Sequence, residues 1–164
     1  MSYTFPLAPM SPSIKVLTII LWLLPFSILM FSYQERLAVI VCLLIILLYG
    51  SIWIWFRPSR FTICTDYLKI VFPGRQLKIP FQDILSVSSI SIETFKGEFG
   101  WAMRIGAGGL WGGFGWLWTS KKGMLEFYIS RVEEFVFIER LNKKSLLITP
   151  ENPAEFVKIL QRQL

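Results

Sequence analysis

The sequence contains no histidine and only two cysteines among its 164 residues. The absence of histidine excludes the Ser-His-Asp and Cys-His arrangements of nucleophilic catalysis and every metal motif that depends on imidazole. Cys42 lies in a long apolar run and Cys64 lies outside it, so the pair predicts neither a disulfide framework nor a zinc site. We therefore expect no catalytic residue, no metal ion and no cofactor.

The acidic residues do not compensate for this absence. They are scattered, and the adjacent pair Glu133 and Glu134 would point to opposite faces of a strand. An enzyme acting on lipid or peptide is therefore disfavoured, and we predict that the protein is not an enzyme.

Charge is almost missing from the first third of the chain, because residues 16–56 hold only Glu35 and Arg36. The net charge is +6 and the mean hydropathy is +0.54. No basic stripe or recognition motif is present, which argues against nucleic acid as a partner. The mild basic excess of residues 57–164 suits work beside an anionic membrane, although interspersed charges are equally typical of a solvated face.

Two uncharged apolar runs occupy residues 16–33 and 37–56, with lengths of 18 and 20 residues. At about 1.5 Å per residue each is roughly 27–30 Å long as a helix, enough to cross a bilayer. Only three residues separate the runs, so we expect an antiparallel transmembrane hairpin. A signal peptide is the weaker interpretation, since no basic segment precedes Lys15 and no cleavage site follows the first run.

Basic residues near the ends of the runs predict their orientation. Lys15 lies at one end of the hairpin, Arg57 and Arg60 lie at the other, and the loop between the runs holds only Arg36. By the positive-inside rule both termini are cytoplasmic, in a cell (inner) membrane. The predicted organisation is a short N-terminal tail (1–15), the two-span hairpin (16–56) and a cytoplasmic domain (57–164).

The predicted domain carries short β-branched and aromatic runs separated by turn signals. We expect seven strands, at residues 60–65, 67–72, 77–81, 82–92, 125–130, 134–140 and 145–150. A helix follows, with Asn152 as its N-cap, Pro153 at its first position and Glu155 three residues after the cap. Its apolar stripe is predicted to pack on the sheet and consists of Phe156, Ile159 and Leu160.

The segment LLITPENPAEFVKIL at the end of the chain resembles the strand, proline-containing turn and helix that close membrane-anchored bacterial pleckstrin-homology (PH) domains. A glycine-aromatic stretch before the fifth strand is also similar to that family. The resemblance implies a mainly-β PH-like domain of seven antiparallel strands in two near-orthogonal sheets with a C-terminal capping helix. It implies no catalysis. Headgroup binding of the phosphoinositide type is doubtful, because Asp66 stands at the tip of the first turn and no basic residue follows until Lys69.

Residues 106–123 read GAGGLWGGFGWLWTSKKG and include seven glycines and three tryptophans. No Gly-Lys-Ser/Thr ending opens a helix, so a phosphate-binding loop is disfavoured. We predict a flexible loop that runs into a strand at residues 114–119, with Phe114, Trp116 and Trp118 on one face. We expect Trp116 and Trp118 in the core, whereas Trp111 suits the core and the bilayer equally.

The residues that we predict to bind the membrane or a partner lie in and beside this stretch. Lysines near an anionic surface attract lipid phosphates, and large apolar groups enter the interface. Arg104 would pair with Glu93 or Glu98, or contact an anionic ligand. The candidate set is Trp101, Arg104, Leu110, Trp111, Lys121 and Lys122.

The predicted function is a noncatalytic interaction or scaffold module, anchored in the membrane, that binds the bilayer surface, a protein partner or a second copy of itself. The alternative is an accessory subunit of a membrane transport or sensory complex that acts through its transmembrane hairpin. No charge inside the spans marks an ion path.

Overall fold

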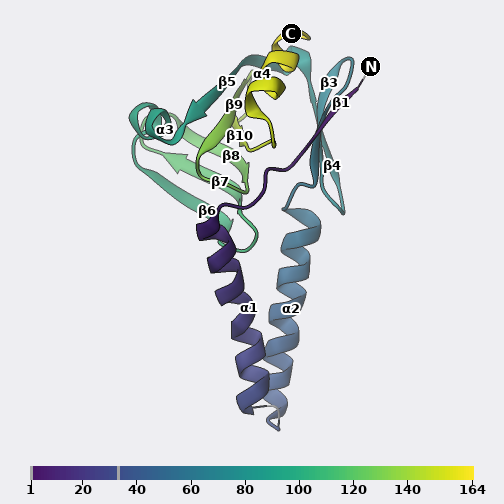
Figure 1. The fold of residues 1–164 in the computed structure, drawn as a ribbon, viewed down its shortest axis with the longest axis vertical. Coiled ribbons are helices and arrows are strands. Elements are labelled where there is room, and N and C mark those ends of the chain that lie inside the picture. Colours follow the sequence, from purple (N-terminus) through teal and green to yellow (C-terminus); the bar gives the residue numbers. More distant parts are fainter. Residues whose placement is uncertain (1, 33) are drawn as a thin grey trace.

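The computed structural model describes residues 2–32 and 34–164 (Figure 1). After one short strand come two long apolar helices, which are followed by a mainly-β domain with two sheets and a C-terminal helix. This outline confirms the predicted order of elements. The number of strands differs, since the structure has ten strands where seven were predicted.

Helices α1 (Pro12–Ser32) and α2 (Arg36–Trp55) run antiparallel below the domain and are called the hairpin from here on (Figure 1). Their most apolar windows have mean hydropathies of 2.3 and 2.8, and only 11% of each window is buried. The Tyr49 hydroxyl donates to the carbonyl of Leu21 (2.9 Å), and the Cys42 thiol donates to that of Pro25 (3.3 Å). Both helices are long and apolar enough to cross a membrane, and their exposure is unlike that of a soluble core helix.

The first sheet has the strand order β1-β2-β3-β4 and is antiparallel throughout. Its strands are β1 (Tyr3–Pro6), β2 (Arg60–Ile63), β3 (Tyr67–Val71) and β4 (Gln76–Pro80). Strand β1 lies in the segment that we expected to be a tail. Phe5 of β1 is buried against Phe156, with ring centroids 5.2 Å apart. Four residues are too short a run to carry a strand signal of their own.

The second sheet has the order β5-β9-β10-β8-β7-β6. Its strands are β5 (Ile84–Ser91), β6 (Ala102–Gly108), β7 (Gly113–Thr119), β8 (Gly123–Ile129), β9 (Glu134–Arg140) and β10 (Leu146–Ile148). The prediction of antiparallel pairing throughout is wrong at one place, because β10 runs parallel to β8. Strand β6 was missed, since its three glycine or alanine positions at residues 106–108 resemble a loop.

The predicted strand at residues 82–92 is also too long. A short 3-10 turn, η1 (Phe81–Asp83), precedes β5, and helix α3 (Ile92–Phe99) follows it. The Ser91 hydroxyl caps α3 by accepting a hydrogen bond from the amide of Thr94 (3.2 Å). Phe95 and Phe99, four residues apart, are both buried. This amphipathic spacing was the available signal for a helix.

Two hydrophobic cores result from this arrangement. Helix α4 (Pro153–Gln161) begins with Pro153, as predicted, and buries Phe156 and Leu160 between the two sheets. The side chain of Asn152 occupies the N-cap position but makes no capping hydrogen bond. The second core lies on the opposite face of the six-stranded sheet, where α3 covers Leu117 and Phe127.

Candidate interaction surfaces at the open end of the hairpin

The loop between β6 and β7 reaches into the open end of the hairpin. The Thr18 hydroxyl of α1 accepts a hydrogen bond from the amide of Trp111 (2.9 Å). Its single proton faces two acceptors, the carbonyl of Ile14 in the same helix (2.7 Å) and that of Gly109 in the loop (3.0 Å). Gly109 has a φ of +95°, and a Cβ there would lie 2.6 Å from a methyl carbon of Leu17. The glycine is therefore required for both the backbone conformation and the close approach to the helix.

Trp111 packs among the aromatic residues of both helices. Its ring lies 4.8 Å from that of Trp53 in α2 and 6.3 Å from that of Trp22 in α1, measured between centroids. Trp111 also has a φ of +59°, a conformation that is uncommon for a bulky residue and costs of order 1–3 kcal/mol. The strain is held by the contacts of the ring and by the hydrogen bond to Thr18.

The turn between β3 and β4 caps the other helix. The Gly74 amide donates to the carbonyl of Ile54 (2.9 Å), and Nε of Arg75 donates to that of Trp55 (2.8 Å). These are two of the final carbonyls of α2, which have no partner inside the helix. A guanidinium at this position also complements the negative end of the helix dipole. The domain is thus fixed to both helices at once.

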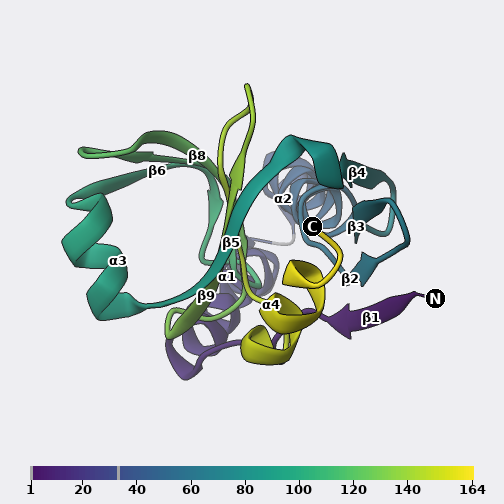
Figure 2. The same ribbon diagram turned by 90° about the horizontal axis from the view of Figure 1, so that it is seen from above.

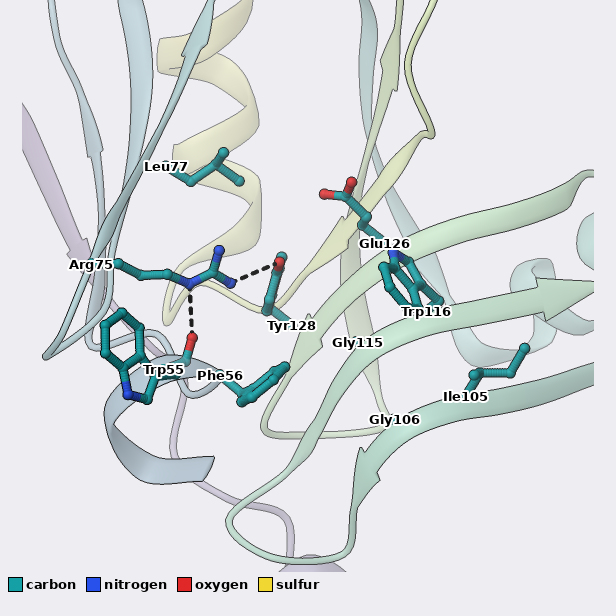
Figure 3. A pocket seen from close by; sticks show the side chains of 10 residues that line it. All are labelled: Trp55, Phe56, Arg75, Leu77, Ile105, Gly106, Gly115, Trp116, Glu126 and Tyr128. Atoms are coloured by element: carbon teal, nitrogen blue, oxygen red, sulfur yellow. Dashed lines mark hydrogen bonds between the residues drawn. The ribbon is translucent and has the colours of Figure 1, made fainter. Parts of the chain in front are cut away.

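Between these two attachments lies a cleft of about 610 Å³ (Figure 3). It separates the two sheets, and the end of α2 forms its floor. A second hydrogen bond of Arg75 runs to the hydroxyl of Tyr128 (3.4 Å). Burial is the main cause that raises the pKa of Tyr128 above its ordinary value, so the phenol stays protonated at neutral pH. The lining residues are Trp55, Phe56, Arg75, Leu77, Ile105, Gly106, Gly115, Trp116, Glu126 and Tyr128.

Charge in the cleft is unequally compensated. Glu126 forms an ion pair with the buried Arg140, with a nitrogen-to-oxygen distance of 3.1 Å. Among the described residues no carboxylate lies within ion-pair distance of Arg75. The positive charge of Arg75 is therefore the uncompensated one.

Beyond the cleft, one face of the six-stranded sheet is left uncovered. The core between the sheets includes residues of β5, β9 and β10, but on β7 and β8 it reaches only Phe114 and Tyr128. The next residues outward on β6 and β7 pair as Ile105 with Trp116 and Met103 with Trp118. With Trp101, whose ring is 5.9 Å from that of Trp118, they form what we call the aromatic surface. Its members are 37% to 67% exposed: Trp101, Met103, Ile105, Trp116 and Trp118.

The expectation that Trp116 and Trp118 lie in the core is therefore wrong. The alternation along β7 was correct, since Phe114 on the same face is completely buried. The error arose because the covering sheet ends before it reaches the two tryptophans, and alternation within one strand cannot show where another sheet ends.

The structure divides the predicted binding residues among separate places. Leu110 is buried and Trp111 lies between the helices. Lys121 donates to the carbonyl of Gly97 (2.7 Å), and Lys122 lies 3.8 Å from Glu98 and over the ring of Phe99. Both lysines thus contact α3 and not the hairpin.

Trp101 and Arg104 lie elsewhere, on or beside the edge strand β6. Arg104 borders a recess beside α3. Within the described part of the chain it has no ion pair, and Glu98 is the partner of Lys122 instead.

Sequence reasoning missed Thr18, Arg75 and Tyr128 as residues of the junction and the cleft. Thr18 is one of few polar residues in the first apolar run, which was the one signal for it. Nothing local marks Arg75 or Tyr128, since their positions depend on how the two sheets meet.

A family model for the bacterial PH domain matches residues 59–164, well over half of the chain. The chain belongs to the bacterial PH domain family. The resemblance stated from the closing segment is thereby confirmed, and a PH-like domain suggests a noncatalytic interaction module. No curated protein and no solved structure matches the chain. In this PH domain and its hairpin, residues 2–32 and 34–164 contain no group of three His, Cys, Asp or Glu side chains able to hold a metal ion.

Proposed function

We propose that the protein is a noncatalytic interaction module held at the inner face of the cell membrane by its hairpin. Both termini and the PH domain are cytoplasmic in this proposal. The apolar, exposed faces of α1 and α2 support the anchoring. The distribution of basic residues supports the orientation, since Lys15, Arg57 and Arg60 lie at the open end and Arg36 alone lies at the turn.

The aromatic surface is the observation that carries this proposal. Contiguous exposed apolar patches mark interaction sites, and tryptophan is enriched among residues that dominate binding energy. In Figure 1 strands β9, β10, β8, β7 and β6 follow one another downward toward the hairpin, and in Figure 2 β6 and β8 nearly overlie one another. The face of this sheet is thus parallel to the helices and faces sideways from them. It suits a protein partner in the same membrane better than the bilayer.

The bilayer surface is reached by Arg104 and by Trp101, the member of the aromatic surface that lies beside the edge strand. Strand β6 is the edge of the sheet nearest the hairpin (Figure 1), and Trp101 and Arg104 are exposed along it. An aromatic ring and a guanidinium both suit the headgroup region. We assign these two residues to contact with the membrane surface, while Leu110 and Trp111 join the domain to its anchor.

Site-specific photocrosslinking in intact cells tests the proposal. A photoreactive amino acid replaces Trp118 in the full chain, and the control places it at Leu85, which is 57% exposed on β5. We expect a defined protein adduct from position 118 that is lost when Trp116→Glu is added, and none from position 85. Equal adducts from both positions would show that the aromatic surface has no special role. An adduct with a second copy of the chain would identify self-association.

An accessory subunit acting through the hairpin is the second candidate, because α1 carries an apolar groove of about 550 Å³ beside its proline. Van der Waals packing drives the association of transmembrane helices, and a groove offers another helix a surface on which to pack. The groove is lined by Thr18, Ile19, Trp22, Leu23, Pro25, Phe26, Leu29 and Ile46. If this candidate is correct, Leu23→Trp releases a copurifying membrane protein, whereas Trp116→Glu leaves that protein bound.

A further inference from the structure

We propose that the cleft between the two sheets binds the phosphate headgroup of an anionic lipid from the leaflet in which the hairpin ends. This inference rests on the proposed membrane anchoring and adds a lipid ligand at a cleft that borders the aromatic surface and shares Ile105 and Trp116 with it. The headgroup would lie beside Arg75 and Tyr128, with the glycerol region of the lipid against Phe56 and Ile105 (Figure 3).

The cleft contains hydrogen-bond donors that the protein leaves unused. A guanidinium has five N–H donors in a planar fork that matches phosphate. Two of the Arg75 donors are used, by the carbonyl of Trp55 and the hydroxyl of Tyr128. Within the described residues the Tyr128 hydroxyl accepts from Arg75 and has no acceptor of its own. The remaining guanidinium donors and the phenol proton together can hold one phosphate oxygen pair.

The charge balance of the cleft selects an anion. Arg140 already neutralises Glu126, with a nitrogen-to-oxygen distance of 3.1 Å. The carboxylate therefore repels a phosphate only weakly, and it does not attract the ammonium group of a zwitterionic headgroup. Arg75 remains without a carboxylate partner among the described residues. Hydrogen bonds between a guanidinium and a phosphate are among the strongest that proteins form. An anionic headgroup with hydroxyl substituents fits these groups better than a zwitterionic one.

The position of the cleft favours a lipid over a soluble phosphate. Its floor is Trp55, the last residue of α2, and Phe56, which follows it, and both side chains are about half exposed. In a membrane these two residues contact the lipids that surround α2, so a neighbouring lipid reaches the cleft without leaving the leaflet. The apolar side chains of Phe56, next to the end of α2, and Ile105 suit the glycerol and upper acyl region. A volume of about 610 Å³ is within the usual range for small-ligand sites.

The test uses the full chain in nanodiscs of phosphatidylcholine that contain a small, varied fraction of phosphatidylglycerol with a photoactivatable group near its glycerol. Labelled residues are located by mass spectrometry. We expect saturable labelling in peptides that contain Trp55–Phe56 and Ile105. Tyr128→Phe keeps the ring beside Phe72 and removes the donor, and it should weaken labelling about tenfold, as expected for one hydrogen bond to a charged group.

A matched pair of variants separates the cleft from the rest of the sheet. Ile105→Glu puts a carboxylate at the cleft, and Met103→Glu puts one on the same strand and the same face, two residues farther out and outside the lining. We expect Ile105→Glu to abolish labelling and Met103→Glu to keep it. Equal labelling of the two variants, or labelling unchanged in Tyr128→Phe, would overturn the proposal.

Two further experiments test whether the phosphate belongs to a lipid or to a soluble molecule, and whether the protein is anchored in the membrane. Competition by millimolar glycerol phosphate as effective as that by phosphatidylglycerol would mean that the cleft takes a soluble anion and would overturn the lipid assignment. Extraction of the protein from membranes by alkaline carbonate would instead overturn the anchoring itself. If the protein resists extraction but labelling is absent, the lipid site is ruled out while the membrane anchoring still stands.

Discussion

At the scale of single residues, the hydroxyl of Thr18 connects an apolar helix to a loop of the domain, which is unusual for a side chain in such a helix. It forms hydrogen bonds with the backbone of Gly109 and Trp111, which are 91 and 93 positions farther along the chain. The Trp111 amide donates to this hydroxyl, whose single proton is shared between the carbonyls of Ile14 (2.7 Å) and Gly109 (3.0 Å). The hydroxyl therefore fixes the loop of the domain to the first helix.

Replacing Thr18 by valine should loosen this loop without changing the shape of the helix. The Trp111 amide would lose its acceptor, at a cost of about 1–3 kcal/mol. Amide hydrogen exchange in residues 109–112, measured in nanodiscs, should become about 5- to 150-fold faster. Ser27→Ala is the control, because that hydroxyl bonds only to the carbonyl of Leu24 in its own helix. Unchanged exchange in Thr18→Val would mean that ring packing alone holds the loop.

Tyr128 provides a residue-scale prediction about pH. Burial raises its pKa, and this effect outweighs the opposing one of Arg75. A group whose pKa is higher in the folded state stabilises the fold below its unfolded pKa, about 10 for tyrosine, and this contribution is lost as pH rises through the folded value. Thermal unfolding should therefore show a loss of stability above pH 10 that is smaller in Tyr128→Phe. Parallel curves for the two proteins would contradict this assignment.

At the scale of elements, the turn between β3 and β4 shows how closely a loop can approach a helix end. A Cβ on Gly74 would lie 2.6 Å from Cγ2 of Ile54 and 3.3 Å from its carbonyl oxygen. The turn would have to withdraw from α2, and the two hydrogen bonds that cap the helix would lengthen. The absence of a side chain is thus what permits the second attachment.

Gly74→Ala should destabilise the protein by about 1–3 kcal/mol, the usual cost of overpacking. Gly97 is the matched control, because it lies inside α3 with open space around its Cα. Alanine at position 97 should stabilise the helix by about 0.5–1 kcal/mol. Chemical unfolding in detergent measures both values, and effects of the same sign would contradict the close approach seen here.

The elements also show what could be inferred from the sequence and what could not. The two apolar helices, α4 and most strands of the domain were predicted from the spacing of apolar residues and from helix start signals. Helix α3 was missed although Ser91 and the spacing of Phe95 and Phe99 were available, because the preceding alternation was extended too far. The cleft and the aromatic surface depend on where one sheet ends against another, which no local pattern records.

At the scale of the whole molecule, the N-terminal strand connects the start of the hairpin to the finished domain. Phe5 of β1 pairs opposite Phe61 and packs on Phe156 of α4. The first and last segments of the chain thus meet in one core. Loss of this strand would affect both the sheet and the position of α1.

Phe5→Ala should cost about 3–5 kcal/mol, as for other buried phenylalanines. Tyr3→Ala is the control, since Tyr3 lies on the same strand and the same face but is 42% exposed; its effect should stay within about 1 kcal/mol. Thermal unfolding in detergent, followed by near-ultraviolet circular dichroism, compares the two. An equally small effect at Phe5 would mean that β1 detaches readily from the sheet.

The pairing of β1 with β2 has a consequence for how the protein is made. The hydrogen bond from the Leu7 amide to the carbonyl of Ser59 continues the pairing of Pro6 with Arg60, so α1, α2 and their turn are topologically the loop of one β-hairpin. If the hairpin spans the membrane as proposed, β1 and β2 can pair only on the side to which the chain returns after its second span. Completion of the first sheet would then depend on correct insertion, and a chain whose second span failed to insert would keep an unpaired sheet edge.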